Sequence, residues 1–301
     1  MMGPGRGFVG LALVVGASVI GGCPWNAAGN TGCRPAGPPV ALPEVLHESS
    51  GAAWSLIRPG AFWTHNDGSD STLHALDEDA TLLSRVRVTG ARLRDLEDMA
   101  TGACDLGSCI YLADTGDNQE VRSQIQILRL QEPDPATGGS AEAQVFPMVL
   151  PHGPRDIEAL FVLPGEEIYL VTKGRNHPNT LYRYPPPLRS GEVVTLEEVQ
   201  TLSDGPMPIL AQVTGADATP DGGLVAIRTY QELRFYRVDG GRLTLLEGGS
   251  VALRTLQEPQ GEGVALGPDH RVILTTEAGN FGGVAAMRIL ECDLPRDPGA
   301  P

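Results

Sequence analysis

The sequence predicts an all-β fold, a β-propeller with five four-stranded blades, from two observations. Short apolar runs are separated by frequent turns, since the 301 residues include 38 Gly and 25 Pro. One short pattern also returns five times, at intervals of 45 to 61 residues. A repeat of this length with four strands per copy is typical of propeller blades.

Each copy of the repeat starts with a polar or acidic residue, continues with a small or apolar one and leads into an apolar strand. The five copies are ESSGAAW at 48, DLEDMA at 95, DIEALFV at 156, GADATPDG at 215 and QGEGVAL at 260. Second and third apolar segments follow in every copy, and a fourth follows in four of them. One blade alone cannot bury both faces of its sheet, whereas neighbours packed around an axis can.

The fifth copy has no fourth strand of its own, because the segment ECDLPRDPGAP is short and rich in proline. The segment PPVALPEVL precedes the first copy and belongs to no other blade. We therefore expect this N-terminal strand to complete the fifth blade and close a propeller that covers 40–295. Six blades are the alternative, if the stretch 185–213 contains another copy.

The first 23 residues predict export and a lipid anchor. An apolar run at 7–22 follows Arg6 and ends in Ile20-Gly21-Gly22-Cys23. As a helix it would rise only about 24 Å, less than a bilayer core of roughly 30 Å. The order of hydrophobic run, small residues and cysteine resembles a bacterial lipobox. We expect 1–22 to be a signal peptide and Cys23 to carry a lipid such as palmitate at the cell envelope. An ordinary secretory signal and an uncleaved anchor are the alternatives.

The tether and the tail are expected to lie outside the propeller. Residues 23–39 are rich in Gly, Pro and Asn and predict a flexible tether, and 296–301 form a short tail.

Four further cysteines fit an oxidising compartment outside the cytoplasm. Cys104 and Cys109 flank a short insert, which predicts a local disulfide. Cys33 and Cys292 remain as the second pair and would join the two ends of the propeller. A zinc site is not expected, because neither pair has CxxC spacing. Free thiols are the alternative.

The charge balance limits the partners. The chain has 22 Lys+Arg against 37 Asp+Glu, a formal net charge of -15. Nucleic acid is not expected, because binding its phosphates needs clustered cations. Anionic lipid headgroups are disfavoured for the same reason. The expected partners are the membrane, through the lipid anchor alone, and an unknown protein or small-molecule ligand.

The repeat predicts a ring of carboxylates, because the inner strands of a propeller surround its axis. The acidic residues aligned in the repeat are Glu97, Glu158, Asp217 and Glu262. Such a group of like charges would be stabilised by Ca²⁺ or another divalent cation. The alternative is structural, with each carboxylate capping backbone N–H groups of the neighbouring blade.

The loops after the second strands supply further candidates at the same end. The predicted ligand-binding residues are Asn66, Asp67, Asp117, Asn118, Arg175 and Glu277, and the predicted catalytic ones are His65, Asp114, Lys173 and Arg228. Ordinary turn formation is the alternative for the Asn, Asp and Gly residues.

Several strings of the sequence carry a family resemblance. WTHND, LEDMA followed by YLADTGDN, DIEALFV and QGEGVAL resemble a group of bacterial secreted β-propellers. More remotely, the chain is similar to phytase-like and SMP-30/gluconolactonase-type propellers. In the gluconolactonase-like group an acidic residue of an inner strand helps to bind a divalent metal at the axis, and Glu262 is its match here. The asparagine and aspartate partners of that metal have no one-to-one match.

Two functions of different classes follow. The sequence has no GxSxG, HExxH, phosphate-loop or GxGxxG signature, which favours a non-catalytic, lipid-anchored propeller that binds a ligand or protein through its loop face. The alternative is a metal-dependent hydrolase of lactonase or phosphoesterase type, with Lys173 and Arg228 holding an anionic substrate.

Overall fold

Five β-sheets surround a central axis in the computed structural model, which describes residues 1, 32–267, 269–279 and 283–295. Within four of the sheets, the strands follow the order of the chain from the axis to the rim, and in the fifth the outermost strands come from the N-terminal segment. The prediction of a five-bladed propeller is therefore confirmed.

The strands of the blades occupy equivalent places in each repeat. The innermost strands are β3 (Ser49–Trp54), β7 (Leu96–Cys104), β12 (Ile157–Leu163), β17 (Val213–Ala218) and β21 (Gln260–Leu266). The second strands are β4 (Ala61–Asn66), β8 (Gly107–Asp114), β13 (Glu167–Thr172), β18 (Leu224–Thr229) and β22 (Arg271–Glu277). The third strands are β5 (Thr72–Asp77), β9 (Ile125–Gln131), β14 (Thr180–Arg183), β19 (Glu232–Asp239) and β23 (Ala286–Glu291). The first four blades end with β6 (Leu82–Thr89), β11 (Gln144–Val149), β16 (Glu197–Thr201) and β20 (Arg242–Ala252).

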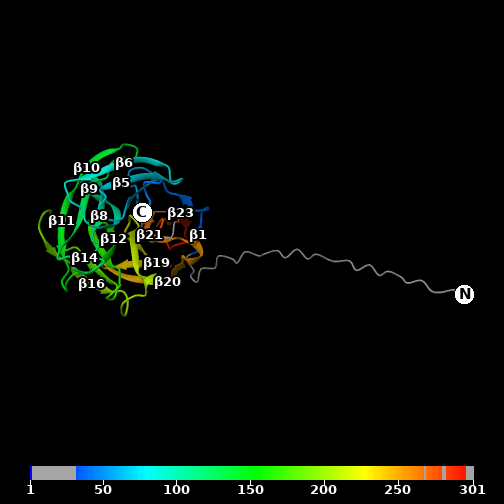
Figure 1. Cartoon of the computed structure of the whole chain (residues 1–301). Coiled ribbons are helices and arrows are strands. Elements are labelled where there is room, and N and C mark those ends of the chain that lie inside the picture. Colours follow the sequence, from blue (N-terminus) through cyan, green and yellow to red (C-terminus); the bar gives the residue numbers. More distant parts are fainter. Residues whose placement is uncertain (2–31, 268, 280–282, 296–301) are drawn as a thin grey trace.

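The chain also adds strands to the rim of blades it has already left. β10 (Gly139–Glu142) pairs in parallel with β6 of the first blade, and β15 (Val194–Thr195) pairs in parallel with β11 of the second. Figure 1 shows β10, β11 and β16 at the rim and β12 and β21 near the centre.

The stretch 185–213 forms no sixth blade. It contains β15, β16 and the short 3₁₀ helix η1 (Ile209–Ala211). A second 3₁₀ helix, η2 (Arg254–Leu256), precedes the fifth blade. Within the described ranges, no helix has the length and hydrophobicity that a membrane span requires.

The hydrophobic core is divided into five clusters, each between two neighbouring blades. Successive side chains of a strand point to opposite faces, so four of the five inner strands contribute to the clusters on both of their sides, while β17 contributes to the cluster between the third and fourth blades. Trp63 is fully buried between the first and second blades, and Phe161 stacks on Tyr169 between the third and fourth, with ring centroids 5.1 Å apart. No blade buries its faces without its neighbours, as the repeat predicts.

The propeller is closed by the N-terminal segment, as expected. β1 (Arg34–Pro35) and β2 (Val40–Ala41) both pair antiparallel with β23 and take the fourth position of the fifth blade. The disulfide Cys33–Cys292 joins the two ends of the closure, which confirms this predicted pair.

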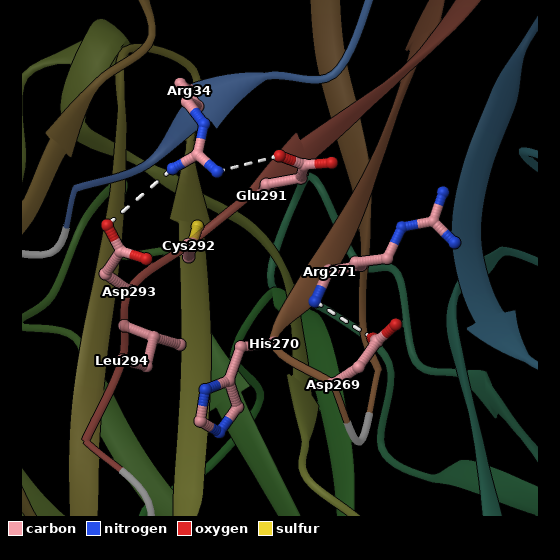
Figure 2. A pocket seen from close by; sticks show the side chains of 8 residues that line it. All are labelled: Arg34, Asp269, His270, Arg271, Glu291, Cys292, Asp293 and Leu294. Carbon is pink, nitrogen blue, oxygen red and sulfur yellow. Dashed lines mark hydrogen bonds and ion pairs between the residues drawn. The ribbon is translucent and has the colours of Figure 1, made fainter.

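Next to the closure lies a hollow of about 480 Å³ (Figure 2). Arg34 reaches from its edge to Glu291 at 2.9 Å and to Asp293 at 3.7 Å, so these charges pair with one another. The last part of the predicted tether, 23–39, therefore belongs to the fifth blade. The predictions for the signal peptide beyond Met1, for Cys23 and for the tail 296–301 fall outside the described residues.

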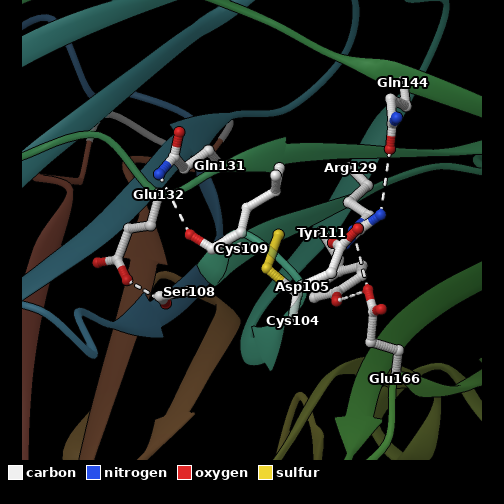
Figure 3. The surroundings of a disulfide bond; sticks show 11 residues. Cys104, Asp105, Ser108, Cys109, Tyr111, Arg129, Gln131, Glu132, Gln144 and Glu166 are labelled. Atoms are coloured by element: carbon white, nitrogen blue, oxygen red, sulfur yellow. Dashed lines mark hydrogen bonds and ion pairs between the residues drawn. A yellow bond between two sulfur atoms is a disulfide. The ribbon is translucent and has the colours of Figure 1, made fainter.

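The second predicted disulfide, Cys104–Cys109, is also confirmed (Figure 3). It bridges the hairpin between β7 and β8. Beside it, Glu166 from the third blade accepts a hydrogen bond from the Tyr111 hydroxyl at 2.6 Å and pairs with Arg129 at 2.8 Å. These contacts attach the second blade to the third.

Candidate functional site

Two positions of every blade meet at one end of the disc, which we call the cluster end. There each inner strand begins with a β-bulge and each second strand ends. A bulge inserts one residue into a strand and re-aims a side chain. The bulges include Ser50, Glu97, Glu158, Thr214 and Glu262, and the residues at or just after the ends of the second strands are Asp67, Thr115, Lys173, Tyr230 and Glu277.

A group of charged side chains, here called the axial cluster, fills this end. Its members are Asp67, Asp95, Glu97, Asp156, Glu158, Lys173, Glu262 and Glu277. They come from the first, second, third and fifth blades. Glu158 of the third blade and Glu262 of the fifth interact electrostatically although these blades are not neighbours, so the cluster extends across the axis.

The carboxylates of the axial cluster form two triplets with the spacing of metal ligands. One oxygen from each of Asp67, Asp95 and Glu97 lies within 4.8 Å of the others, and the same holds for Glu97, Asp156 and Glu158. Gly116 gives them room, because a Cβ atom at this position would collide with the carboxylates of Glu97 and Asp95. Carboxylate oxygens gathered in this way are the ligands that Ca²⁺ prefers.

Lys173, the only lysine of the chain, is buried in the cluster. Its Nζ lies 2.6 Å from Oε1 of Glu158 and 3.9 Å from Oδ2 of Asp156. Burial disfavours its charge, but the neighbouring carboxylates outweigh burial and raise the pKa of Lys173. Lys173 therefore stays protonated and neutralises part of the Asp156–Glu158 side of the cluster.

Several carboxyl groups of the cluster bind protons more tightly than free ones. Burial, followed by repulsion from neighbouring carboxylates, raises the pKa of Asp67 to about 6 and that of Glu277 to about 8. Burial raises the pKa of Glu262 to about 7. Burial also raises the pKa of Glu97 and of Glu158 well above the ordinary value. A divalent cation would replace these protons and relieve the repulsion.

Two carboxylate oxygens in the cluster lack a hydrogen-bond donor among the described residues. Asp156 is buried, and its Oδ1 accepts the backbone N–H of Asp117 at 2.8 Å. Its Oδ2 accepts no hydrogen bond and lies 3.8 Å from a guanidinium nitrogen of Arg175. Oδ1 of Asp67 is also without a donor. Buried oxygens of this kind normally have a partner, so these atoms are open to a ligand.

Asp217 does not join the other three residues of the predicted ring. The register of the fourth blade places Thr214 at the bulge, so the alignment through Asp217 is three residues off. The Asp217 carboxylate accepts the backbone N–H groups of Ala218 and Leu266, each at 2.8 Å, and burial raises its pKa to about 8. It thus caps the neighbouring blade, which is the structural alternative considered for the ring.

Three of the predicted catalytic residues are occupied by structural contacts. His65 is fully buried, its Nδ1 lies 2.9 Å from the carbonyl oxygen of Asn66, and burial lowers its pKa to about 4. Arg228 is fully buried and donates to Glu258 at 2.6 Å and to two backbone carbonyls. The carboxylate of Asp114 accepts four hydrogen bonds. Only Lys173, the fourth, lies in the axial cluster.

The predicted ligand-binding residues divide in the same way. Asp67 and Glu277 belong to the axial cluster. Asn66 holds the backbone, since its amide donates to Val45 and accepts from Glu48. Arg175 is partly exposed and donates a hydrogen bond to the side chain of Asn118 at 2.6 Å, and this contact links a loop of the third blade to a loop of the second. The carboxylate of Asp117 accepts the backbone N–H of Arg122 in the loop of the second blade.

Sequence reasoning missed Asp95 and Asp156, each two residues before a glutamate of the repeat. The signal was present, because both copies start with the pattern Asp-x-Glu. In a regular strand these side chains would share one face, and the bulge at the glutamate brings both toward the cluster.

The comparisons with known proteins bear on the fold. No protein-family model matches the sequence, and no curated protein matches it either. Among solved structures, the PQQ-bound aldose sugar dehydrogenase from Streptomyces coelicolor is 14% identical, covers 89% of this chain and 100% of its own, and gives a TM-score of 0.52. A gluconolactonase from Xanthomonas campestris is 13% identical over 86% of this chain and 99% of its own, with a TM-score of 0.46. The chain is thus similar in fold to an enzyme propeller, and at this identity the similarity extends to the fold alone.

Proposed function

We propose that the protein is an extracytoplasmic binding propeller that holds a divalent cation, Ca²⁺ in the first place, in the axial cluster and binds a ligand or protein partner at the cluster end. The observation that carries the proposal is the pair of carboxylate triplets that share Glu97. Seven carboxyl groups of the cluster face one lysine, so the residues present leave negative charge uncompensated. Asp156 Oδ2 and Asp67 Oδ1, which lack donors among the described residues, support a ligand there.

The residues divide the cluster into two sides of different charge. Lys173 contacts Glu158 and lies near Asp156, so this side is partly neutralised. Asp67, Asp95 and Glu97 have no such contact with Lys173, and this triplet is the preferred place for the cation. Hard oxygen ligands favour Ca²⁺ over softer metals.

Calorimetric titration of the EDTA-treated full chain with Ca²⁺ tests the proposal. We expect binding, proton release, and a rise in the free energy of unfolding of about 2.7 kcal/mol at 100 times the Kd. Glu97→Gln should abolish these effects because Glu97 belongs to both triplets. Glu142→Gln, the same change on the exposed edge strand β10, should leave them intact. Absence of binding for Ca²⁺, Mg²⁺, Mn²⁺ and Zn²⁺ alike would refute the cation site.

The lipid anchor is part of the same proposal and is tested separately. The sequence Ile20-Gly21-Gly22-Cys23 supports it. Cys23→Ser should move the protein from the membrane fraction to the soluble fraction and remove labelling by radioactive palmitate. Unchanged association of this variant with membranes would contradict lipidation at Cys23.

The alternative function, a metal-dependent hydrolase of lactonase or phosphoesterase type, has one observation in its favour. Burial brings the pKa of Glu262 to about 7, the range that suits a general base at neutral pH. A bound cation would supply polarisation of the substrate and activation of water. Turnover of simple lactones or of p-nitrophenyl phosphate that needs Ca²⁺ or Mn²⁺ and falls at least 100-fold in Glu262→Gln would establish this function. Its absence with every metal would leave the binding function alone.

A further inference from the structure

A hollow of about 530 Å³ lies beside the axial cluster, between the first and second blades. Three arginines contribute to its lining: Arg92 and Arg94 from the segment that enters β7, and Arg122 from the loop before β9. Further polar residues of the lining are Ser69, Asp114 and Gln126. Arg94 directly precedes Asp95, a member of the axial cluster, so the hollow borders on the cluster.

The single carboxylate of the hollow is saturated by its own surroundings. Asp114 is buried, and one of its oxygens accepts the backbone N–H groups of Arg94 and Asp95 at 3.2 and 2.8 Å. The same oxygen pairs with the guanidinium of Arg122 at 3.3 Å, and the other accepts a hydrogen bond from Gln126 at 2.6 Å. Asp114 and Arg122 thus neutralise each other, and neither needs Arg92 or Arg94.

The charges of Arg92 and Arg94 are not neutralised. Both side chains are exposed, and the described residues offer neither guanidinium an ion pair or a hydrogen bond. In a chain with 37 acidic residues against 22 basic ones, Arg92 and Arg94 bring two unpaired positive charges to the lining of one hollow. The Nε atom of Arg122 is buried and also lacks an acceptor among the described residues. The hollow is therefore a positively charged site on an acidic protein, and it lies next to the negatively charged axial cluster.

We propose that this hollow binds the oxyanion group, phosphate or carboxylate, of a small ligand. Planar guanidinium groups match the oxygens of phosphates and carboxylates and bind them through paired N–H donors. Arg92 and Arg94 supply the charge, and the hydroxyl of Ser69 supplies a further donor. Lys173 and Arg228, which the sequence suggested for this role, are bound to Glu158 and Glu258 instead. The proposal goes beyond the cation site and does not depend on it.

Titration of the full chain with inorganic phosphate and with acetate, after treatment with EDTA and its removal by dialysis, tests the proposal without the cation site. The double variant Arg92→Gln/Arg94→Gln should bind the preferred anion at least tenfold more weakly than the natural chain. The backbone contacts of Arg94 and Asp95 with Asp114 remain in this variant, so the fold should persist. The matched control is Arg85→Gln/Arg87→Gln, which removes two exposed arginines of β6 outside the hollow and should stay within twofold.

Each outcome of the titration either supports or overturns the proposed oxyanion site. Tighter binding of phosphate than of acetate indicates a phosphate ester as the ligand, and the reverse order indicates a carboxylate; both support the site. Equal losses in the two double variants would show general charge attraction and overturn it. Lack of binding by the natural chain at millimolar concentrations would overturn it too, as would binding to phosphatidylglycerol vesicles without any response to the small anions.

Discussion

Buried carboxylates occur at both ends of the disc, but their surroundings differ. At the opposite end, where the inner strands turn into the second strands, Glu132 accepts hydrogen bonds from the hydroxyls of Ser55 and Ser108 at 2.6 and 2.5 Å and from the indole N–H of Trp63 at 3.0 Å (Figure 3 shows Ser108). At the cluster end, Glu262 has one side-chain donor, Gln260 at 2.8 Å, and faces other acids. A buried carboxylate stabilises a fold only where donors replace the water it has lost.

The covalent bonds show the same division. Cys104–Cys109 lies at the opposite end of the disc, where β7 turns into β8. Cys33–Cys292 lies at the same end, directly after the last residue of β23. Both disulfides thus lie at the opposite end, whereas the cluster end keeps charges whose pairing is incomplete. The comparison teaches that both disulfides and a fully paired carboxylate lie at one end of this fold and the proposed cation site at the other, and the predictions below test this division.

The largest effect is expected from the disulfide that closes the propeller. It joins residues 259 positions apart, whereas the other disulfide spans five. In the chain-entropy account, loss of the longer closure costs about 5 kcal/mol of unfolding free energy and loss of the shorter one about 2 kcal/mol. Denaturation of Cys33→Ser/Cys292→Ser and Cys104→Ser/Cys109→Ser measures the difference. Equal losses would show that closure of the ring does not depend on the bond.

The next largest loss of unfolding free energy is expected from removal of the Glu132 carboxylate, whose oxygens are fully hydrogen-bonded at the opposite end. Glu132→Ala leaves the donors of Ser55, Trp63 and Ser108 without their acceptor inside the fold. We expect a loss of about 4 kcal/mol in the free energy of unfolding, measured by urea denaturation. Glu192→Ala, at an exposed position, is the control and should change it by less than about 0.5 kcal/mol. A loss below about 1 kcal/mol for Glu132→Ala would remove the contrast between the two ends.

The cluster end should make the metal-free protein less stable as the pH rises. The folded state keeps protons on Glu262 and Glu277, with pKa values of about 7 and 8, that the unfolded chain has already released. Stability therefore falls as pH rises through these values, and Glu262 and Glu277 together contribute about 2 kcal/mol to the fall between pH 6.5 and 8.5, with the share of Glu277 reduced by solvent. Asp217, whose pKa is also about 8, acts in the same direction. Below pH 6.5 the lowered pKa of His65 acts in the other direction.

The pH effect is measured by denaturation in EDTA and has a specific control. Glu262→Gln should reduce the pH dependence, because the amide does not titrate and Glu277 loses a neighbouring charge, while Glu142→Gln should keep it. Stability that is constant or rises over this range would contradict the proposed state of the cluster.

The smallest effect is expected from the exposed ion pair beside the closure. Arg34 and Glu291 are half exposed, and their contact at 2.9 Å competes with water (Figure 2). Glu291→Gln should change the free energy of unfolding by less than about 0.5 kcal/mol. The melting temperature of this variant should lie within about one or two degrees of that of the natural chain. A larger fall in melting temperature would mean that charge pairing also stabilises the opposite end.

The fold was predictable because its information is repeated in the sequence. Five copies of one pattern fix the inner strands, and the missing fourth strand of the fifth copy fixes the closure by the N-terminal segment. The short spacing of Cys104 and Cys109 indicated one disulfide, and Cys33 and Cys292 remained as the other pair. The rim strands β10 and β15 were not predicted, since a strand that pairs with a blade the chain has already left has no local signal.

The site was predictable where it follows the repeat. Glu97, Glu158 and Glu262 share a bulge position and were found, whereas the fourth blade has Thr214 there, so the nearest acid, Asp217, was aligned in its place. His65 and Arg228 are polar residues near the right end, but burial and backbone contacts occupy them. The backbone contacts of Arg228 are with the neighbouring fifth blade, which the sequence of its own blade does not contain.

The position of β1 has a consequence for how the molecule would sit on a membrane. Arg34 pairs with Glu291 at the opposite end, so the chain enters the propeller there and not at the cluster end. If Cys23 carries the proposed lipid, the residues between it and Cys33 reach at most about 35 Å. So short a connection would keep the opposite end of the disc, which carries both disulfides, near the bilayer. The axial cluster and the arginine hollow would then point away from the lipid, toward whatever diffuses in the surrounding space.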